Sequence, residues 1–461
     1  MKKWLALIIV AIATTLLSGC FDNGSPTDPP SGMQATAGES RVKIEWLPSS
    51  GVDYWLFSAT DAALSAFNWT GLSNTHLYIN ASLPFYACGL INDTPYYFAT
   101  NGRTNGGPGG ASSLQVIAQP YNAINSWAVT PAASGVPATN QLKGVGYASL
   151  TTCSNNATSA SGSFAAVGAG GTIYTSVDNG QNWVARTPFT TDLNAITGYA
   201  ANQNNSTTPA LLWIAVGAGG AATFSNDQGV TWKEGRAVST VPNPALNAIT
   251  HVAGTFFAVG DAANILSTTD GTNWVMHTPA TTVTTNNLRG IAHGTNYVAV
   301  GDSGTILTSG DGNTWASHVL MPPLTTNLKK VTSIGNLIVA VGDAGTIVMS
   351  KDAGATWVVQ TLSGTPNLVG VTAESLVMGS DVTANIVDGW LGTIPTVQFV
   401  AVDSVGHAYV TQRSPTSTAN ITGLTWSATA IPTGASSLNS LVSSGFGYIA
   451  VGNAGTVVSA F

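Results

Sequence analysis

The chain has 461 residues and a net charge of −7, and only 8% of its residues are charged. This length allows more than one domain and a large hydrophobic core. The mild acidity and the lack of a basic tract exclude nucleic acid as the partner, and the 51 glycines favour a turn-rich β protein over a helical one.

The N-terminal stretch MKKWLALIIVAIATTLLSGC has the pattern of an export signal. Two lysines precede an apolar run that is too short and wrongly flanked for a membrane span. The end of the run, LLSGC, resembles the lipobox of bacterial lipoproteins. That resemblance implies a signal peptide over residues 1–19 and a lipid on Cys20 after cleavage. An ordinary secretory signal is the alternative.

The residues that follow Cys20 indicate how the anchored chain continues. Phe21, and not an aspartate, comes directly after the cysteine, which by the same resemblance implies the outer membrane of a bacterial envelope. The segment 20–33 is rich in proline, glycine and serine, so we expect a lipidated cysteine followed by a flexible tether. The protein is therefore expected to meet the membrane through its lipid and to face the periplasm or the cell surface.

A small all-β domain is predicted over residues 34–119. Short alternating runs such as RVKIEWLP and PYYFATNG are separated by turn residues, which is typical of a β-sandwich. Trp46 follows two alternating apolar residues, and Tyr96 follows Leu90 at a step of six. On these landmarks the segment resembles a fibronectin type III domain, which implies a spacer or a binding module.

The rest of the chain is a repeat. A Leu-x-x-(Val/Ile/Leu) motif begins seven units, and a tryptophan after a polar turn ends six of them. Between these landmarks lie an apolar strand that ends in AVG, a tight turn and another strand such as GTIVMS. Each unit therefore holds four strands in about 40 residues, the size of a propeller blade. The leading leucines are Leu142, Leu193, Leu246, Leu288, Leu328, Leu368 and Leu438.

The last unit ends at Phe461, directly after its third strand. The segment at about 124–131, INSWAVTP, is similar to the other fourth strands, and its Trp127 supplies the missing tryptophan. We therefore predict an all-β chain in which residues 124–461 form a seven-bladed β-propeller closed by this N-terminal strand. Such closure leaves no open sheet edge. Six or eight blades are the alternatives, because the unit at 368–437 is degenerate.

The turn SKDAGATW resembles the Asp-box of BNR repeats, Ser-x-Asp-x-Gly-x-x-Trp. In such a turn the serine and aspartate bond backbone N–H groups, the glycine takes a positive φ, and the tryptophan packs against the next blade. Each aspartate stands alone in its turn, so we expect a structural role and neither a metal nor a cofactor. These aspartates are Asp178, Asp227, Asp270, Asp311 and Asp352.

Function is expected where the repeats differ. The residue after each leading leucine should lie at one mouth of the central channel, which we call the top mouth. Two interpretations are open. The aspartates of the AVG turns neutralise the cations there, or the mouth binds an anionic or carbonyl-rich group such as a peptide, a protein terminus or a sugar acid. The predicted site consists of Lys143, Asn194, Asn247, Arg289, Lys329, Lys330 and Asn439.

The repeat LxxV…FxAVGxxGTIxxSxDxGxxW resembles that of the photosystem II assembly and stability factor family, over about residues 124–461. The resemblance implies a seven-bladed propeller, often lipid-anchored, that binds a membrane-protein partner through a basic face. Lys143, Arg289 and Lys329 stand at comparable positions. The fibronectin-like domain departs from that family, and nothing in the chain indicates photosynthesis. The expected role is a non-enzymatic scaffold for binding or assembly.

A glycoside hydrolase of the sialidase kind, or a carbohydrate-binding propeller, is the alternative, because Asp-boxes also occur in those proteins. A sialidase needs three arginines on the substrate carboxylate, a tyrosine–glutamate pair and an acidic proton donor. Of the arginines only Arg289 is expected at the top mouth, and no glutamate is. We therefore expect no catalytic residues.

Two cysteines remain after the lipidation site, Cys88 and Cys153. In an oxidising compartment such cysteines can pair. The predicted topology places one in the sandwich and the other in a loop of the first blade, at the end opposite the top mouth. A disulfide between them is one expectation, and two free buried thiols are the other.

Overall fold

In a computed structural model of the protein, the described residues form β-strands and short 3-10 turns. Two compact units are present, one built mainly from residues before 123 and the other mainly from residues after it. Among the described residues no helix is long and apolar enough to span a bilayer. Cys20 and residues 1–19 lie outside the described part. The structure describes residues 26–38, 41–88, 90–121, 123, 127–129, 135–149, 162–186, 189–201, 210–236, 244–277, 283–376, 396–411, 414–415, 424–431, 437–444 and 447–461.

The first unit contains two antiparallel sheets. One has the order β1-β7-β4-β5, with β8 also paired to β7, and the other has the order β2-β3-β6. The strands are β1 (Pro26–Thr27), β2 (Ser31–Gly38), β3 (Arg41–Leu47), β4 (Asp53–Ala59), β5 (His76–Tyr78), β6 (Phe85–Cys88), β7 (Tyr96–Arg103) and β8 (Val116–Ala118).

The alternation in the sequence sets the core between these sheets. Every second residue of β3 is buried, and Trp46 meets Tyr54 of β4 edge to face, with ring centroids 5.6 Å apart. Tyr96 is 4% exposed, and its hydroxyl accepts a hydrogen bond from Ile91 N at 3.2 Å. A buried hydroxyl needs a hydrogen-bond partner. The Tyr96 hydroxyl therefore holds the segment at Ile91, which leads into β7.

The expected tether over 20–33 is too long. Pro26 and Thr27 of β1 pair with Arg103 and Gly102 of β7, and β2 already begins at Ser31. Proline is tolerated in β1 because this strand lies at the sheet edge, where a missing N–H costs no ladder bond. The proline and glycine content of this segment predicted a flexible tether and gave no signal for this short edge strand.

The described residues of the second unit form seven antiparallel sheets in chain order. The first strands are β10 (Leu142–Ser149), β14 (Leu193–Ala201), β18 (Leu246–Val252), β22 (Leu288–His293), β26 (Leu328–Ile334), β30 (Leu368–Leu376) and β35 (Leu438–Ser443). The second strands are β11 (Gly162–Gly168), β15 (Ala210–Gly217), β19 (Thr255–Gly260), β23 (Tyr297–Gly301), β27 (Leu337–Gly342), β31 (Thr396–Asp403) and β36 (Tyr448–Gly452).

Two further strands complete each sheet. The third strands are β12 (Ile173–Ser176), β16 (Ala221–Ser225), β20 (Ile265–Thr268), β24 (Ile306–Ser309), β28 (Thr346–Ser350), β32 (His407–Thr411) and β37 (Val457–Ala460). The fourth are β13 (Val184–Ala185), β17 (Lys233–Arg236), β21 (Val275–Met276), β25 (Ala316–Ser317), β29 (Val358–Thr361), β34 (Trp426–Ala430) and β9 (Ala128–Val129), while β33 (Ser414–Pro415) adds to β31.

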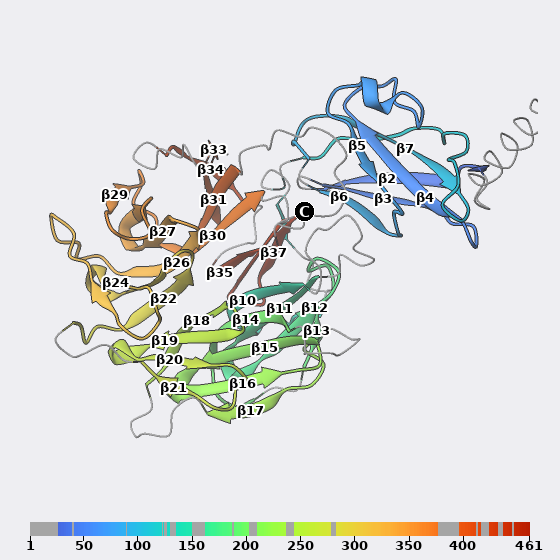
Figure 1. Cartoon of the computed structure of the whole chain (residues 1–461). Helices are drawn as coiled ribbons and strands as arrows, with labels where there is room; N and C mark the ends of the chain where they lie inside the picture. The colour runs from blue at the N-terminus through green and yellow to red at the C-terminus, as the bar shows by residue number, and fades with distance from the viewer. Residues whose placement is uncertain are drawn as a thin grey trace, which may run out of the picture. The chain divides into compact units, whose positions relative to one another are not determined.

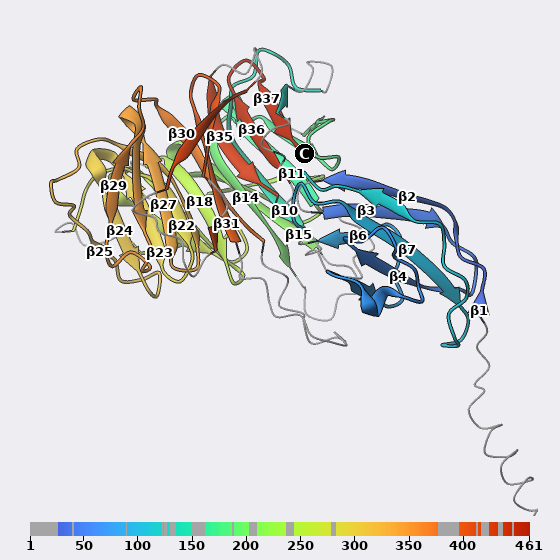
Figure 2. The same ribbon diagram turned by 90° about the horizontal axis from the view of Figure 1, so that it is seen from above.

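The sheets are arranged radially, as in a β-propeller. Each first strand contacts the first strand of the next sheet, and β35 contacts β10 in turn. In Figure 1 the first strands surround the centre of this unit and β17, β21 and β29 lie at its outside, and Figure 2 gives the same unit from a second direction. Apolar clusters fill the spaces between successive sheets, and one joins Trp183 and Phe164 to Ile449 and Val451. Burial of one such side chain stabilises by about 1.5–3 kcal/mol.

The last sheet is completed by a strand from the start of the unit. Val129 of β9 pairs with Val458 of β37, and Ala128 pairs with Ser459. Trp127 is 7% exposed, and its ring lies 6.2 Å from that of Tyr448. The two ends of this unit are therefore held together by main-chain pairing and by an aromatic contact.

The recurring AVG ends in glycine because the first strand passes very close to it. A Cβ built at Gly342 would lie 1.9 Å from Asn327 O, although its φ of −163° is ordinary extended backbone. Only hydrogen fits in that space. In the sixth sheet Asp403 stands at this place, opposite Leu368, and its carboxylate accepts hydrogen bonds from the backbone of Val405 and His407.

The Asp-box turns are held by their own side chains. Ser350 is fully buried, and its Oγ accepts a hydrogen bond from Gly354 N at 2.9 Å. Asp352 Oδ1 accepts from Thr356 N at 2.8 Å, and Gly354 takes a φ of +92°. In the turn of Asp311, hydrogen bonds from Thr314 N and Asn313 N lower the pKa of the aspartate to about 2. The turn therefore uses each aspartate for hairpin geometry.

We expect Ser350→Ala to destabilise the propeller unit, because the buried N–H of Gly354 then loses its acceptor. The expected loss is about 1–3 kcal/mol, measured by urea unfolding at pH 7 with tryptophan fluorescence. Ser317→Ala, on the exposed β25, is the matched control and should change the free energy of unfolding little. Equal losses in the two variants would contradict this account of the turn.

The pairing of β9 with β37 predicts a disulfide in the variant Ala128→Cys, Ser459→Cys. These residues oppose each other in the register and lie far apart in the chain, so the bond restrains the unfolded state strongly. We expect about 2–4 kcal/mol of stabilisation, seen as a higher melting temperature that dithiothreitol reverses. The single cysteine variants should melt like the parent, and failure of the bond to form would contradict the closure.

Candidate functional site

A β-bulge places one residue of each sheet at the top mouth. Leu142 pairs with Gly168 and Gly144 with Val167, so Lys143 between them is left without an opposite residue. The same register shift follows the leading leucine in all seven sheets. A bulge redirects the side chain of the extra residue. The residues so placed are Lys143, Asn194, Asn247, Arg289, Lys329, Val369 and Asn439.

The cations among these bulge residues pair with aspartates. Lys143 Nζ lies 2.8 Å from Asp192 Oδ2, and Lys329 forms an ion pair with Asp343. The hydrogen bond from Lys143 is the main cause that lowers the pKa of Asp192. The side chains of these pairs remain about one-third exposed, so each pair stabilises the fold little.

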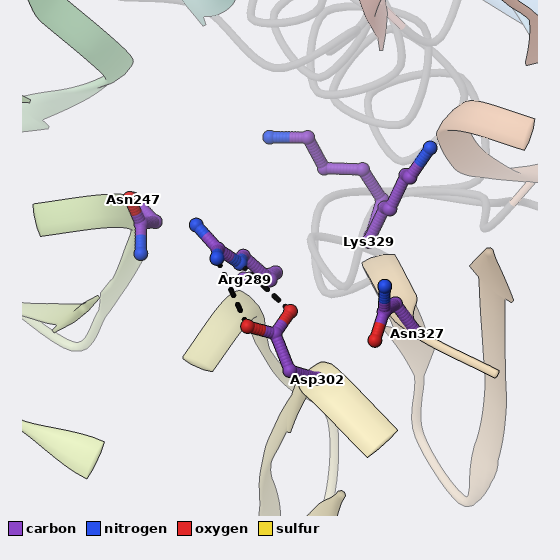
Figure 3. A pocket seen from close by; sticks show the side chains of 6 residues that line it. Asn247, Arg289, Asp302, Asn327 and Lys329 are labelled. Atoms are coloured by element: carbon purple, nitrogen blue, oxygen red, sulfur yellow. Dashed lines mark hydrogen bonds and ion pairs between the residues drawn. The ribbon is translucent and has the colours of Figure 1, made fainter. Parts of the chain in front are cut away.

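Arg289 forms the strongest of the pairs. Its Nε and Nη2 donate to the two carboxylate oxygens of Asp302 at 3.0 and 2.9 Å (Figure 3). This two-pronged geometry lowers the pKa of Asp302 and raises that of Arg289. The remaining guanidinium nitrogen, Nη1, lies 3.7 Å from Asp261 Oδ1, beyond hydrogen-bond distance.

The amides at the bulge positions join neighbouring sheets. Asn194 Nδ2 donates to Leu246 O at 3.0 Å, and Asn247 Nδ2 donates to Leu288 O at 2.9 Å. Asn439 Nδ2 donates to Leu142 O at 2.7 Å and so links the last sheet to the first. The prediction from sequence counted these asparagines among the partner-binding residues. Their hydrogen bonds to the next sheet give them a structural role.

One pocket opens at the top mouth. Its volume is about 370 Å³, and it brings together four of the predicted site residues. Lys143, Asn194 and Asn439 do not line it. Figure 3 shows Arg289 and Asp302 in contact, with Asn247, Asn327 and Lys329 around the same space. The lining consists of Asn247, Arg289, Asp302, Asn327, Lys329 and Lys330.

Sequence reasoning missed the residue that precedes each leading leucine. Asp192 neutralises Lys143, and Asn327 lines the pocket. Asn327 Oδ1 also accepts a hydrogen bond from Ser303 N of the preceding sheet at 3.0 Å. An aspartate or asparagine stands at this position in several repeats, and that pattern was the available signal.

Lys330 differs from the other cations of the mouth. Its side chain is partly buried, and within the described residues it makes no hydrogen bond and no ion pair. Burial lowers the pKa of its ammonium group. An ammonium without a counter-charge in such a place is costly.

Other candidate chemistry lies away from this pocket. No cluster of histidine, cysteine, aspartate or glutamate suited to a metal occurs among the described residues. His251 stacks on Tyr199 with centroids 3.8 Å apart, and burial lowers the pKa of its imidazole to about 4. Glu374 is 1% exposed on β30, where Tyr448 hydrogen-bonds to it.

The remaining predictions involve segments that the structure does not describe. Cys88 is disulfide-bonded. Cys153 lies outside the described residues, so its pairing with Cys88 stays a prediction. Most of the long loops at the end opposite the top mouth also lie outside them.

Comparison with known proteins supports the fold. No protein-family model matches the chain, and no curated protein matches it. A solved structure described as YCF48 bound to D1 peptide is 15% identical, with 73% of this chain and 95% of that chain covered, at a TM-score of 0.50. A catalytically inactive virginiamycin B lyase from Staphylococcus aureus with quinupristin is 10% identical, with 72% and 98% covered, at a TM-score of 0.51. These likenesses show a β-propeller.

The ion pair of Arg289 predicts how Asp302 titrates. A lowered folded-state pKa means that the pair stabilises the fold above the unfolded pKa of about 3.9 and that this stability is lost as pH falls through the folded value. In Arg289→Met the pKa of Asp302 should therefore rise, and stability should fall less between pH 5 and pH 2. Carboxyl-carbon NMR titration measures the pKa, with Lys143→Met as the control that leaves Asp302 unchanged.

Proposed function

We propose that this protein is a non-enzymatic binding scaffold of a bacterial envelope. In this proposal a lipid on Cys20 anchors the chain, and the first unit is a fibronectin type III-like spacer. The seven sheets are the blades of a closed propeller that holds a protein or another anionic partner at its top mouth. The hydrogen bond from Ile91 N to the Tyr96 hydroxyl supports the fibronectin-like assignment, and the pairing of β9 with β37 supports the closure.

The observation that carries the proposal is the charge of the pocket lining. Three cations, Arg289, Lys329 and Lys330, line it with one carboxylate, Asp302. Asp343 pairs with Lys329 and Asp261 lies 3.7 Å from Arg289, both from outside the lining, so Lys330 is the lining cation that has no carboxylate partner within the described residues. A partly enclosed positive charge at the mouth of a channel attracts anionic groups even on an acidic protein.

The similar structures support a binding role in a general way. YCF48 is described with a bound D1 peptide, which makes a protein or peptide the first class of partner to test. The virginiamycin B lyase is an enzyme on the same fold, so the fold alone does not decide between binding and catalysis. The described glutamates Glu45, Glu234 and Glu374 lie on β3, β17 and β30 and line no part of the pocket.

The test is crosslinking and co-purification from the native envelope with a variant that removes the charges of the pocket without leaving lone carboxylates. That variant combines Arg289→Met, Lys329→Met and Lys330→Met with Asp261→Asn, Asp302→Asn and Asp343→Asn. The matched control removes an ion pair of the first unit, Lys43→Met with Glu45→Gln, whose Nζ and Oε1 lie 2.8 Å apart.

We expect one specific partner to be captured by the parent and the control and to be at least tenfold depleted with the mouth variant. Both variants are first checked for folding by their melting curves. Equal capture by all three proteins would contradict a site at the top mouth. Capture of no partner, together with cleavage of a glycan in a substrate screen, would favour the hydrolase.

A further inference from the structure

Lys330 interrupts a rule that the other repeats obey. The residue two places after the leading leucine is small in every other repeat. It resumes the pairing after the bulge, as Lys330 does opposite Val341. The residues at this position are Gly144, Ala195, Ala248, Gly290, Lys330, Gly370 and Ser440.

The packing of the propeller explains why small residues are the rule. A Cβ built at Gly144 would lie 2.9 Å from the Cα of Ala195, and one built at Gly290 would lie 3.1 Å from the Cα of Lys330. The position therefore faces the first strand of the next sheet at close range. By the same repeat geometry Lys330 faces Gly370, which has no side chain. The equivalent residue of the preceding repeat, Gly290, is also a glycine.

Packing thus accommodates Lys330 but does not require it. Lys143, Arg289 and Lys329 are neutralised by Asp192, Asp302 and Asp343, whereas Lys330 has no partner within the described residues. A partly buried charge without a partner lowers stability, and such groups concentrate at functional sites. The lowered pKa of Lys330 agrees with this unpaired state.

A second donor lines the same pocket. Within the described residues Nη1 of Arg289 makes no hydrogen bond and lies 3.7 Å from Asp261 Oδ1, while Nε and Nη2 donate to Asp302. The pocket therefore offers an ammonium and a guanidinium N–H to an incoming group. Because Lys330 is the lining cation without a carboxylate partner in the described part of the chain, a singly charged anion with two acceptor oxygens fits better than a phosphate dianion.

We propose that Lys330 binds a carboxylate of the partner, with Arg289 Nη1 as the second donor. This inference rests on the proposed binding function and narrows it to the chemistry of one contact. An aspartate or glutamate side chain, a chain terminus and a sugar acid all present that chemistry. Among the described cations of the mouth, Lys330 is the one that such a group reaches without displacing an aspartate already in place.

The experiment is calorimetric and NMR titration of the full chain at constant ionic strength. The probes are N-acetyl-aspartate N-methylamide, acetyl-trialanine with a free and with an amidated terminus, glucuronate, glucose and methyl phosphate. The variant is Lys330→Met, and the matched control is Lys351→Met, whose lysine is exposed in an Asp-box turn. The aspartate derivative, the free-terminus peptide and glucuronate distinguish a side chain, a chain terminus and a sugar acid as the source of the carboxylate. The amidated peptide, glucose and methyl phosphate test whether binding requires a single negative charge.

We expect at least one carboxylate probe to bind the parent and Lys351→Met alike, and to bind Lys330→Met at least tenfold more weakly. Lys330→Met should melt at the same temperature as the parent or higher, because it loses an uncompensated charge. Absence of carboxylate binding, equal binding by Lys330→Met, equal binding of methyl phosphate, or a clearly lower melting temperature of Lys330→Met would each overturn the inference.

The same variants separate this inference from the scaffold function. Equal capture of the envelope partner by the parent and Lys330→Met overturns the role of Lys330 and leaves the scaffold in place. Binding of a carboxylate that depends on Lys330, with no partner captured by the parent, supports the site and contradicts the scaffold.

Discussion

The bulge after each leading leucine is the constraint on which the propeller and its mouth depend. It turns the next residue into the mouth and presses the one after that against the neighbouring sheet. In the six sheets that carry it, the AVG glycine completes this arrangement, because a Cβ there would clash with the backbone of the incoming first strand. The repeat therefore builds the propeller, and the bulge residues and their immediate neighbours are among the positions at which the repeats differ.

The residues next to the bulge residues determine which side chains of the mouth are already hydrogen-bonded or paired within the protein. Asparagines at the bulge bond to the next sheet, and three cations are matched by aspartates that stand before a leading leucine or in an AVG turn. The charge-balanced interpretation thus describes most of the mouth. Lys330 departs from it, because within the described residues no carboxylate pairs with this lysine at the second position after the leucine.

Much of this fold could be predicted from the sequence. Repeated spacing of leucine, AVG and tryptophan predicts the strands and their order, since each landmark has one packing role, and the similarity of INSWAVTP to other fourth strands predicts the partner of β37. The edge strand β1 was missed because its two residues, Pro26 and Thr27, lie in a segment rich in proline, glycine and serine. Pairing at the mouth was not predictable in detail, because Asp192 and Asn327 act across sheets whose distance the sequence does not contain.

The central claim is that the partner meets the propeller at the top mouth, and a site-specific photocrosslinker tests it most directly. Val369 is the apolar bulge residue, so a photoreactive amino acid there removes no ion pair. Ala355, exposed in an Asp-box turn at the other end of the strands, is the matched position. The account predicts a crosslinked product in the native envelope from position 369 and none from position 355. A product from position 355 alone would contradict it.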